Sequence, residues 1–119
     1  MDQEKRNLSE RLLDFVVNVI KLAEALPKSP TARHIGAEMV RACTSCGANY
    51  EEACGAESRS DFIHKMSIVL KELKETRFWL RVVHRAEMVE SKQIESITNE
   101  CEQLCAIIAR SILTAKKRK

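Results

Sequence analysis

The chain has 119 residues, of which 45% are hydrophobic and 31% charged, with only 3 Gly and 2 Pro. This length suits one domain with its own core. The composition excludes a disordered chain, and the scarcity of turn residues argues against an all-β fold. The formal net charge is +3, but residues 116–119 alone carry +4, which leaves −1 on residues 1–115. The basic character therefore belongs to the C-terminal tail.

The polarity of the N-terminal segment and the number of cysteines indicate the cellular location. The first residues are polar and no long apolar segment follows them, so we expect neither a signal peptide nor a membrane-spanning helix. The 5 cysteines form an odd number, which favours free thiols in a reducing compartment. We therefore expect a cytoplasmic protein.

Apolar residues recur at helical spacing in four segments, at about 8–26, 30–54, 59–87 and 92–114. In each segment one line of apolar residues repeats at alternating spacings of three and four. Short connections join the segments, and short loops between long helices force antiparallel neighbours. The sequence thus predicts an all-α fold, an antiparallel up-and-down four-helix bundle. We expect residues 1–119 to form this single domain, ending in a basic tail at 115–119.

Prolines and capping residues separate the predicted helices. Pro27 breaks the first helix, and Pro30 suits the first turn of the second, where a missing N–H costs nothing. Serine side chains favour N-cap positions because their oxygen accepts from a free backbone N–H. We expect Ser29, Ser58 and Ser91 to cap the second, third and fourth helices.

The sequence offers few catalytic or metal-binding motifs. The pairs Cys43/Cys46 and Cys101/Cys105 could supply four thiolates to zinc, but such pairs usually sit in turns and Cys is a common small core residue. The Asp-x-x-His match at His64 has no second copy, which a di-iron bundle would need. The sequence contains no nucleophile elbow and no phosphate-binding loop. We expect no enzymatic activity, metal, cofactor or small-molecule substrate.

Two polar residues stand on apolar lines where a bundle core is expected. Asn49 lies on the line of the second segment and Thr76 on that of the third. Two interpretations are open: a ligand-binding or catalytic site, or a buried network that fixes helix register, as a single Asn does in a coiled coil. We favour the structural interpretation. The candidate network comprises Arg41, Ser45, Asn49, Glu52, Glu75 and Thr76.

Basic residues gather in two places, a stripe on the third helix and the C-terminal tail. Either group could contact phosphates. The alternative for the stripe is a solvated face balanced by nearby Glu residues, and for the tail a helix end complemented by positive charge. The candidate nucleic-acid contacts are Arg77, Arg81 and Arg85 in the stripe and Lys116, Lys117, Arg118 and Lys119 in the tail.

The stretch Arg41-Ala-Cys-Thr-Ser-Cys-Gly-Ala-Asn49-Tyr-Glu-Glu52 resembles the R-A-x-x-S-I-x-x-N-x-x-E signature of four-helix bundle proteins of the 23S rRNA intervening-sequence type. Residues 56–65 and 70–80 resemble the third-helix pattern of that family, and the likeness covers about residues 10–112. Cys46 replaces the usual Ile of the signature, and Ala53 stands where many members have Gly.

The resemblance implies a bundle that assembles into a ring, typically a pentamer. It also relates the chain to accessory proteins of diversity-generating retroelements, which are basic pentamers that work with a reverse transcriptase and RNA. The nearly neutral body of this chain differs from them. We expect a non-catalytic homo-oligomeric scaffold or adaptor, with an RNA- or ribosome-associated binding protein as the alternative. Apolar residues beyond one core line per helix also favour an interface; they are Leu13, Val17, Ile20, Ile68, Trp79 and Val82.

Overall fold

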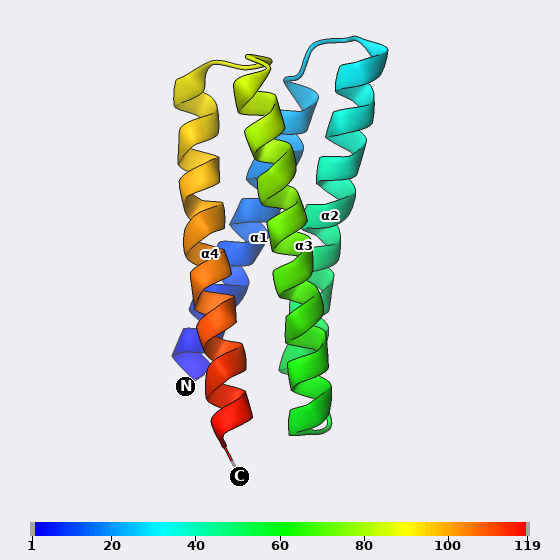
Figure 1. Ribbon diagram of the computed structural model, residues 1–119. Coiled ribbons are helices and arrows are strands. Elements are labelled where there is room, and N and C mark those ends of the chain that lie inside the picture. The colour runs from blue at the N-terminus through cyan, green and yellow to red at the C-terminus, as the bar shows by residue number, and fades with distance from the viewer. Residues whose placement is uncertain (1, 119) are drawn as a thin grey trace.

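The computed structural model describes the backbone of residues 2–118 and the side chains of residues 7–118. Its helices are α1 (Asp2–Glu24), α2 (Pro30–Cys54), α3 (Arg59–Arg85) and α4 (Ser91–Lys117). They run up and down side by side, so that the start of α1 and the end of α4 lie at the same end of the molecule (Figure 1). No strand occurs within residues 2–118. The predicted all-α four-helix bundle is confirmed.

The core consists of one line of apolar side chains from each helix. These lines face inward because residues three and four apart share a side of a helix. Full burial of one such side chain is worth about 1.5–3 kcal/mol. The residues that are at most 2% exposed include Leu12, Phe15, Val19, Met39, Cys46, Val69, Leu73, Leu80, Leu104 and Ile108.

The four seams of the bundle differ in their extent. α2 packs most extensively against α3, whereas α1 and α4 contact each other least. The α1–α4 seam is reinforced by Arg11, which donates to the two carboxylate oxygens of Glu100 (2.7 and 3.0 Å) and to Gln103 (3.2 Å). On the α1–α2 seam, a Cβ atom on Gly47 would lie 3.2 Å from Val16 Cγ2, so this glycine lets the two helices approach closely.

Helices α1 and α4 differ from the predicted segments at their ends. α1 begins at Asp2 rather than near residue 8, because residues 2–6 are mostly good helix formers with no breaker among them. It ends at Glu24, since the residue before Pro27 is disfavoured in helical geometry. α4 continues to Lys117, three residues past its predicted end, so part of the expected tail is helical.

α3 ends at Arg85, two residues before its predicted end, in a tight turn. Glu87 adopts a left-handed backbone with φ 55°. Its N–H donates to the carbonyl of His84 (3.0 Å), and the next N–H, that of Met88, donates to the carbonyl of Val83 (3.1 Å). These two bonds satisfy the last carbonyls of α3 in the manner of a Schellman motif.

Two of the three predicted serine caps are confirmed. Ser29 Oγ accepts from the N–H of Ala32 (3.1 Å), and Ser58 Oγ accepts from the N–H of Asp61 (3.0 Å). The third prediction was wrong: α4 starts one residue earlier than expected, Glu90 occupies its N-cap, and no side chain caps it.

Because Ser29 caps a helix and Ser91 does not, replacing each with Ala should lower stability by different amounts. Ser29→Ala should lower the free energy of unfolding by about 1 kcal/mol, because the N–H that it caps loses its partner. Ser91→Ala, the matched control, should change it by less than about 0.5 kcal/mol. Urea unfolding measures both values. Equal losses in the two variants would contradict the assignment of the caps.

Candidate functional site

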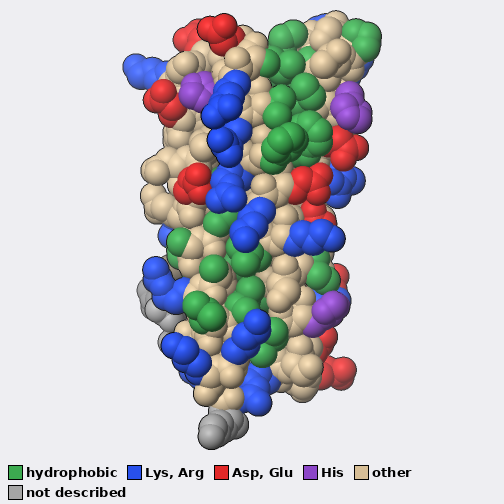
Figure 2. Space-filling model, in the orientation of Figure 1, with side chains coloured by type: hydrophobic (Ala, Val, Ile, Leu, Met, Phe, Trp, Pro, Cys, Tyr) green, Lys and Arg blue, Asp and Glu red, His purple; other side chains and the backbone are tan. Residues whose placement is uncertain are grey.

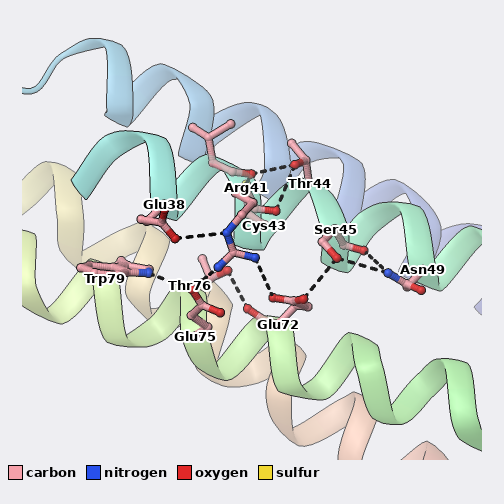
Figure 3. Close-up of polar contacts among 11 residues, drawn as sticks. Glu38, Arg41, Cys43, Thr44, Ser45, Asn49, Glu72, Glu75, Thr76 and Trp79 are labelled. Carbon is pink, nitrogen blue, oxygen red and sulfur yellow. Dashed lines mark hydrogen bonds and ion pairs between the residues drawn. The ribbon is translucent and has the colours of Figure 1, made fainter. Parts of the chain in front are cut away.

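The main polar cluster lies on the seam between α2 and α3 (Figure 3). Arg41 of α2 pairs with Glu75 of α3 and also donates to Glu38 of its own helix (3.1 Å). Its Nη1 lies 3.7 Å from Oε1 of Glu72, also on α3. One guanidinium thus joins three carboxylates on two helices, a geometry that the planar fork of Arg suits better than a Lys would.

Glu72 is the carboxylate of this cluster that is most shielded from solvent, with a side chain 15% exposed. Its Oε2 accepts from Ser45 Oγ of α2 (3.3 Å). Its Oε1 is buried and has no hydrogen-bond partner among the described residues, so the nearby Arg41 supplies the balancing charge. Glu72 was not in the predicted network, although it lies one turn before Thr76 on the same helix.

Glu75 connects the cluster to aromatic residues. It accepts from the indole Nε1–H of Trp79, one turn further along α3 (3.2 Å). Trp79 meets His34 of α2 edge to face at 6.3 Å between ring centroids, and Phe78 at 5.0 Å. The Arg41 guanidinium and the Trp79 indole together hold the pKa of Glu75 below its usual range. Glu75 therefore stays ionised at neutral pH.

Three other predicted members of the network lie outside the Arg41 cluster. Asn49 is half-buried and donates within α2, to the carbonyl (2.9 Å) and Oγ (3.2 Å) of Ser45. Thr76 is fully buried and donates to the carbonyl of Glu72 within α3 (2.8 Å). Glu52 is exposed and pairs with Lys65 of α3 (2.8 Å), at a separate place on the same seam.

The cysteines contribute to the core. Four are buried, Cys54 is half-buried, and all five are free thiols. Burial raises the pKa of Cys43 to about 12. The neighbouring Cys101 thiol and the Arg77 charge lower the pKa of the Cys105 thiol, although only 7% of that residue is exposed. Among residues 7–118, no group of three or more His, Cys, Asp and Glu side chains is placed to hold a metal ion.

The three arginines of the predicted basic stripe on α3 have different surroundings. Arg77 pairs with Glu102 of α4 (3.0 Å), while Arg81 and Arg85 are exposed. Two further exposed lysines of the same helix, Lys71 and Lys74, were not in the prediction. Of the predicted tail contacts, Lys116 and Lys117 lie in the last turn of α4, and Arg118 follows it; Lys119 lies outside the described residues.

Two hollows lie on the sides of α1. The one towards α2 has a volume of about 740 Å³ and is lined mainly by apolar residues, including Ile20, Ala23 and Val40. The one towards α4 has a volume of about 300 Å³ and is mainly polar, with the Arg11–Glu100 pair at its wall. In the part of the chain that the structure covers, no helix is long and apolar enough to span a membrane.

Comparison with known proteins identifies the family. A family model described as 23S rRNA-intervening sequence protein matches residues 4–110. The chain belongs to this family. It is also similar to a solved structure, a protein of unknown function from the S23 ribosomal protein family of Bacteroides thetaiotaomicron, with 34% identity over 88% of this chain and 97% of that one and a TM-score of 0.82. No curated protein matches the chain.

In this member of the 23S rRNA-intervening sequence family, the signature stretch Arg41–Glu52 lies in α2, and several of its polar residues face α3. Arg41 and Ser45 meet the Glu72 carboxylate, and Glu52 meets Lys65. The polar residues of the signature thus contribute contacts between helices. Contacts of this kind can fix how two helices align, and that role stays a prediction for these residues.

The lowered pKa of Glu75 predicts a specific pH dependence of stability. The contribution of Glu75 to the free energy of unfolding is fully present above the pKa of an unfolded Glu, about 4.3. It is lost as the pH falls through the lower pKa that Glu75 has in the folded protein. Glu75→Gln should therefore be less stable than wild type at pH 7, and the difference should narrow as the pH falls to about 3. Urea unfolding at several pH values measures it.

The control is Glu95→Gln, on an exposed part of α4, where the carboxylate makes no ion pair within residues 7–118. That variant should keep the pH dependence of wild type. A constant difference between Glu75→Gln and wild type from pH 7 to pH 3 would rule out the proposed coupling of Glu75 to Arg41.

Proposed function

We propose that this chain is a non-catalytic homo-oligomeric scaffold or adaptor that works in the cytoplasm, with a five-fold ring as the specific assembly. The observation that carries the proposal is an apolar line on the outer side of α1. Leu13 is 57% exposed and Val17 is 40% exposed, whereas most large apolar side chains of the bundle are buried. Ile20 follows them at helical spacing and is half-buried.

This line leads into the apolar hollow between α1 and α2. Ile20 belongs to both, and Ala37 and Val40 of α2 form part of the opposite wall. The small side chains leave room there for larger side chains of another molecule. Burying the exposed part of Leu13 and Val17 would be worth about 1 kcal/mol each, because each residue is about half exposed and full burial of such a side chain is worth about 1.5–3 kcal/mol. A continuous exposed apolar surface of this kind usually marks a protein interface.

A second copy of the chain is the partner that the proposal names. When one surface of a protomer binds a different surface of the next protomer, the copies form a closed ring if their rotation adds up to a full turn, and an open filament otherwise. The apolar surface of α1 and α2 serves as one half of such a contact. Three other apolar residues singled out in the sequence, Ile68, Trp79 and Val82, lie half-buried on α3 and are available for the other half.

The oligomer can be tested with two residues of equal exposure. Leu13 on α1 and Leu113 on α4 are each 57% exposed. Leu13→Glu should reduce the assembly to smaller species, because it places a charge in the apolar contact. Leu113→Glu should leave the mass unchanged. Light scattering at micromolar concentration measures both, with five times 13.5 kDa expected for wild type. A monomeric wild type would contradict the proposal.

RNA or ribosome binding is the second candidate function, and the C-terminal charges favour it. Lys116 and Lys117 extend the last turn of α4 and Arg118 follows, all of them exposed. They complement the helix dipole, an effect worth about 0.3–1 kcal/mol. In a five-fold ring, the four charges of each tail would bring about twenty positive charges to one end, enough for salt-sensitive binding to phosphates.

A further inference from the structure

The outermost line of α3 carries a regular row of cations around one aromatic ring. Lys71, Lys74, Phe78, Arg81 and Arg85 follow each other at spacings of three, four, three and four, and all are exposed. The core line of α3, which includes Leu73, Thr76 and Leu80, lies on the opposite side of the helix. We call these five residues the basic row. At 1.5 Å per residue it is about 21 Å long.

The four cations of the basic row are free to take an anionic partner. Within residues 7–118, the ion pairs involve other cations, such as Arg41, Lys65 and Arg77, and none involves these four. Figure 2 shows Lys and Arg side chains in a column along the face over α3, with hydrophobic side chains beside its upper part. Like charges at such close spacing repel each other unless a partner neutralises them.

Phe78 lies in the middle of the basic row, and its ring packs against that of Trp79. It is 54% exposed, which leaves much of the ring in contact with solvent. Trp79 meets it edge to face at 5.0 Å and 71°, and is itself held by the Glu75 carboxylate (3.2 Å). Such edge-to-face support fixes the ring while leaving part of it available for stacking.

We propose that the basic row binds a single strand of nucleic acid, with phosphates along its Lys and Arg side chains and a base stacked on Phe78. A track of cations with an aromatic platform is the combination that recognises unpaired strands, since stacking needs an exposed base face that a duplex does not offer. The inference rests on the second candidate function and moves its main site from the tail to α3. It does not depend on the ring.

The test is fluorescence anisotropy of the full chain with labelled single-stranded RNA, single-stranded DNA and duplex RNA of equal length, over a range of salt. The single strands should bind more tightly than the duplex. Phe78→Leu should weaken single-strand binding roughly 5- to 150-fold, the usual loss when one stacking ring is removed. Phe78→Tyr should bind like wild type, because it keeps the ring.

The charges are tested by the salt dependence of the same binding. Lys71→Gln with Lys74→Gln should make the slope of log affinity against log salt shallower by about 1.4, or 0.7 for each lost phosphate contact. The matched control is Lys21→Gln with Lys92→Gln, two exposed lysines on α1 and α4. That pair should leave the slope unchanged. Light scattering on every variant separates effects on assembly from effects on binding.

Four results would overturn the inference. The first is equal affinity of Phe78→Leu and wild type, and the second is no binding of any strand at low salt. The third is tighter binding to phosphatidylserine vesicles than to any strand, lost in Phe78→Leu, which would make the row a membrane contact. If a chain that ends at Ala115 loses RNA binding while the row variants keep it, the second candidate function stands through its tail and the basic row fails.

Discussion

The cluster of Arg41 with Glu72 and Glu75 sets the axial position of α2 against α3, and the rest of the structure depends on it. Apolar lines that repeat every three and four residues can slide by two turns and still meet apolar partners. An ion pair with a shielded carboxylate cannot, because sliding would leave the carboxylate of Glu72 without its balancing charge. The alignment of the two most extensively packed helices is therefore specified by a few polar atoms.

This cluster also reaches the surface. Glu75 holds the Trp79 indole, and Trp79 supports Phe78 in the basic row. The contact proposed for assembly pairs Leu13 and Val17 on α1 with residues of α3 that lie beside the basic row, not on it; they are Ile68, Trp79 and Val82. Assembly and strand binding therefore use different sides of α3. Each protomer of a ring would carry one row, and one long strand that engages several copies would bind with much greater avidity than one row provides.

The sequence predicted what depends on local pattern and missed what depends on contacts between helices. Core lines, the α2 bounds and the Ser29 cap follow from spacing and from the preferences of single residues. The cap predicted at Ser91 failed because the helix starts at that residue rather than after it. Glu72 looked like any surface Glu until α2 was seen to place Arg41 beside it. Likewise, Arg77 looked equivalent to its neighbours, but Glu102 across the α3–α4 seam neutralises it.

The central claim is that Arg41 and Glu72 act together across the α2–α3 seam. A double-mutant cycle measures this directly, through the free energies of unfolding of wild type, Arg41→Ala, Glu72→Ala and the double variant. Because Glu72 is shielded while Arg41 is half exposed, the coupling should exceed about 0.5 kcal/mol without reaching the values of fully buried pairs. The double variant should then lose less stability than the two single losses combined. Additive losses, with a coupling below about 0.3 kcal/mol, would contradict the account.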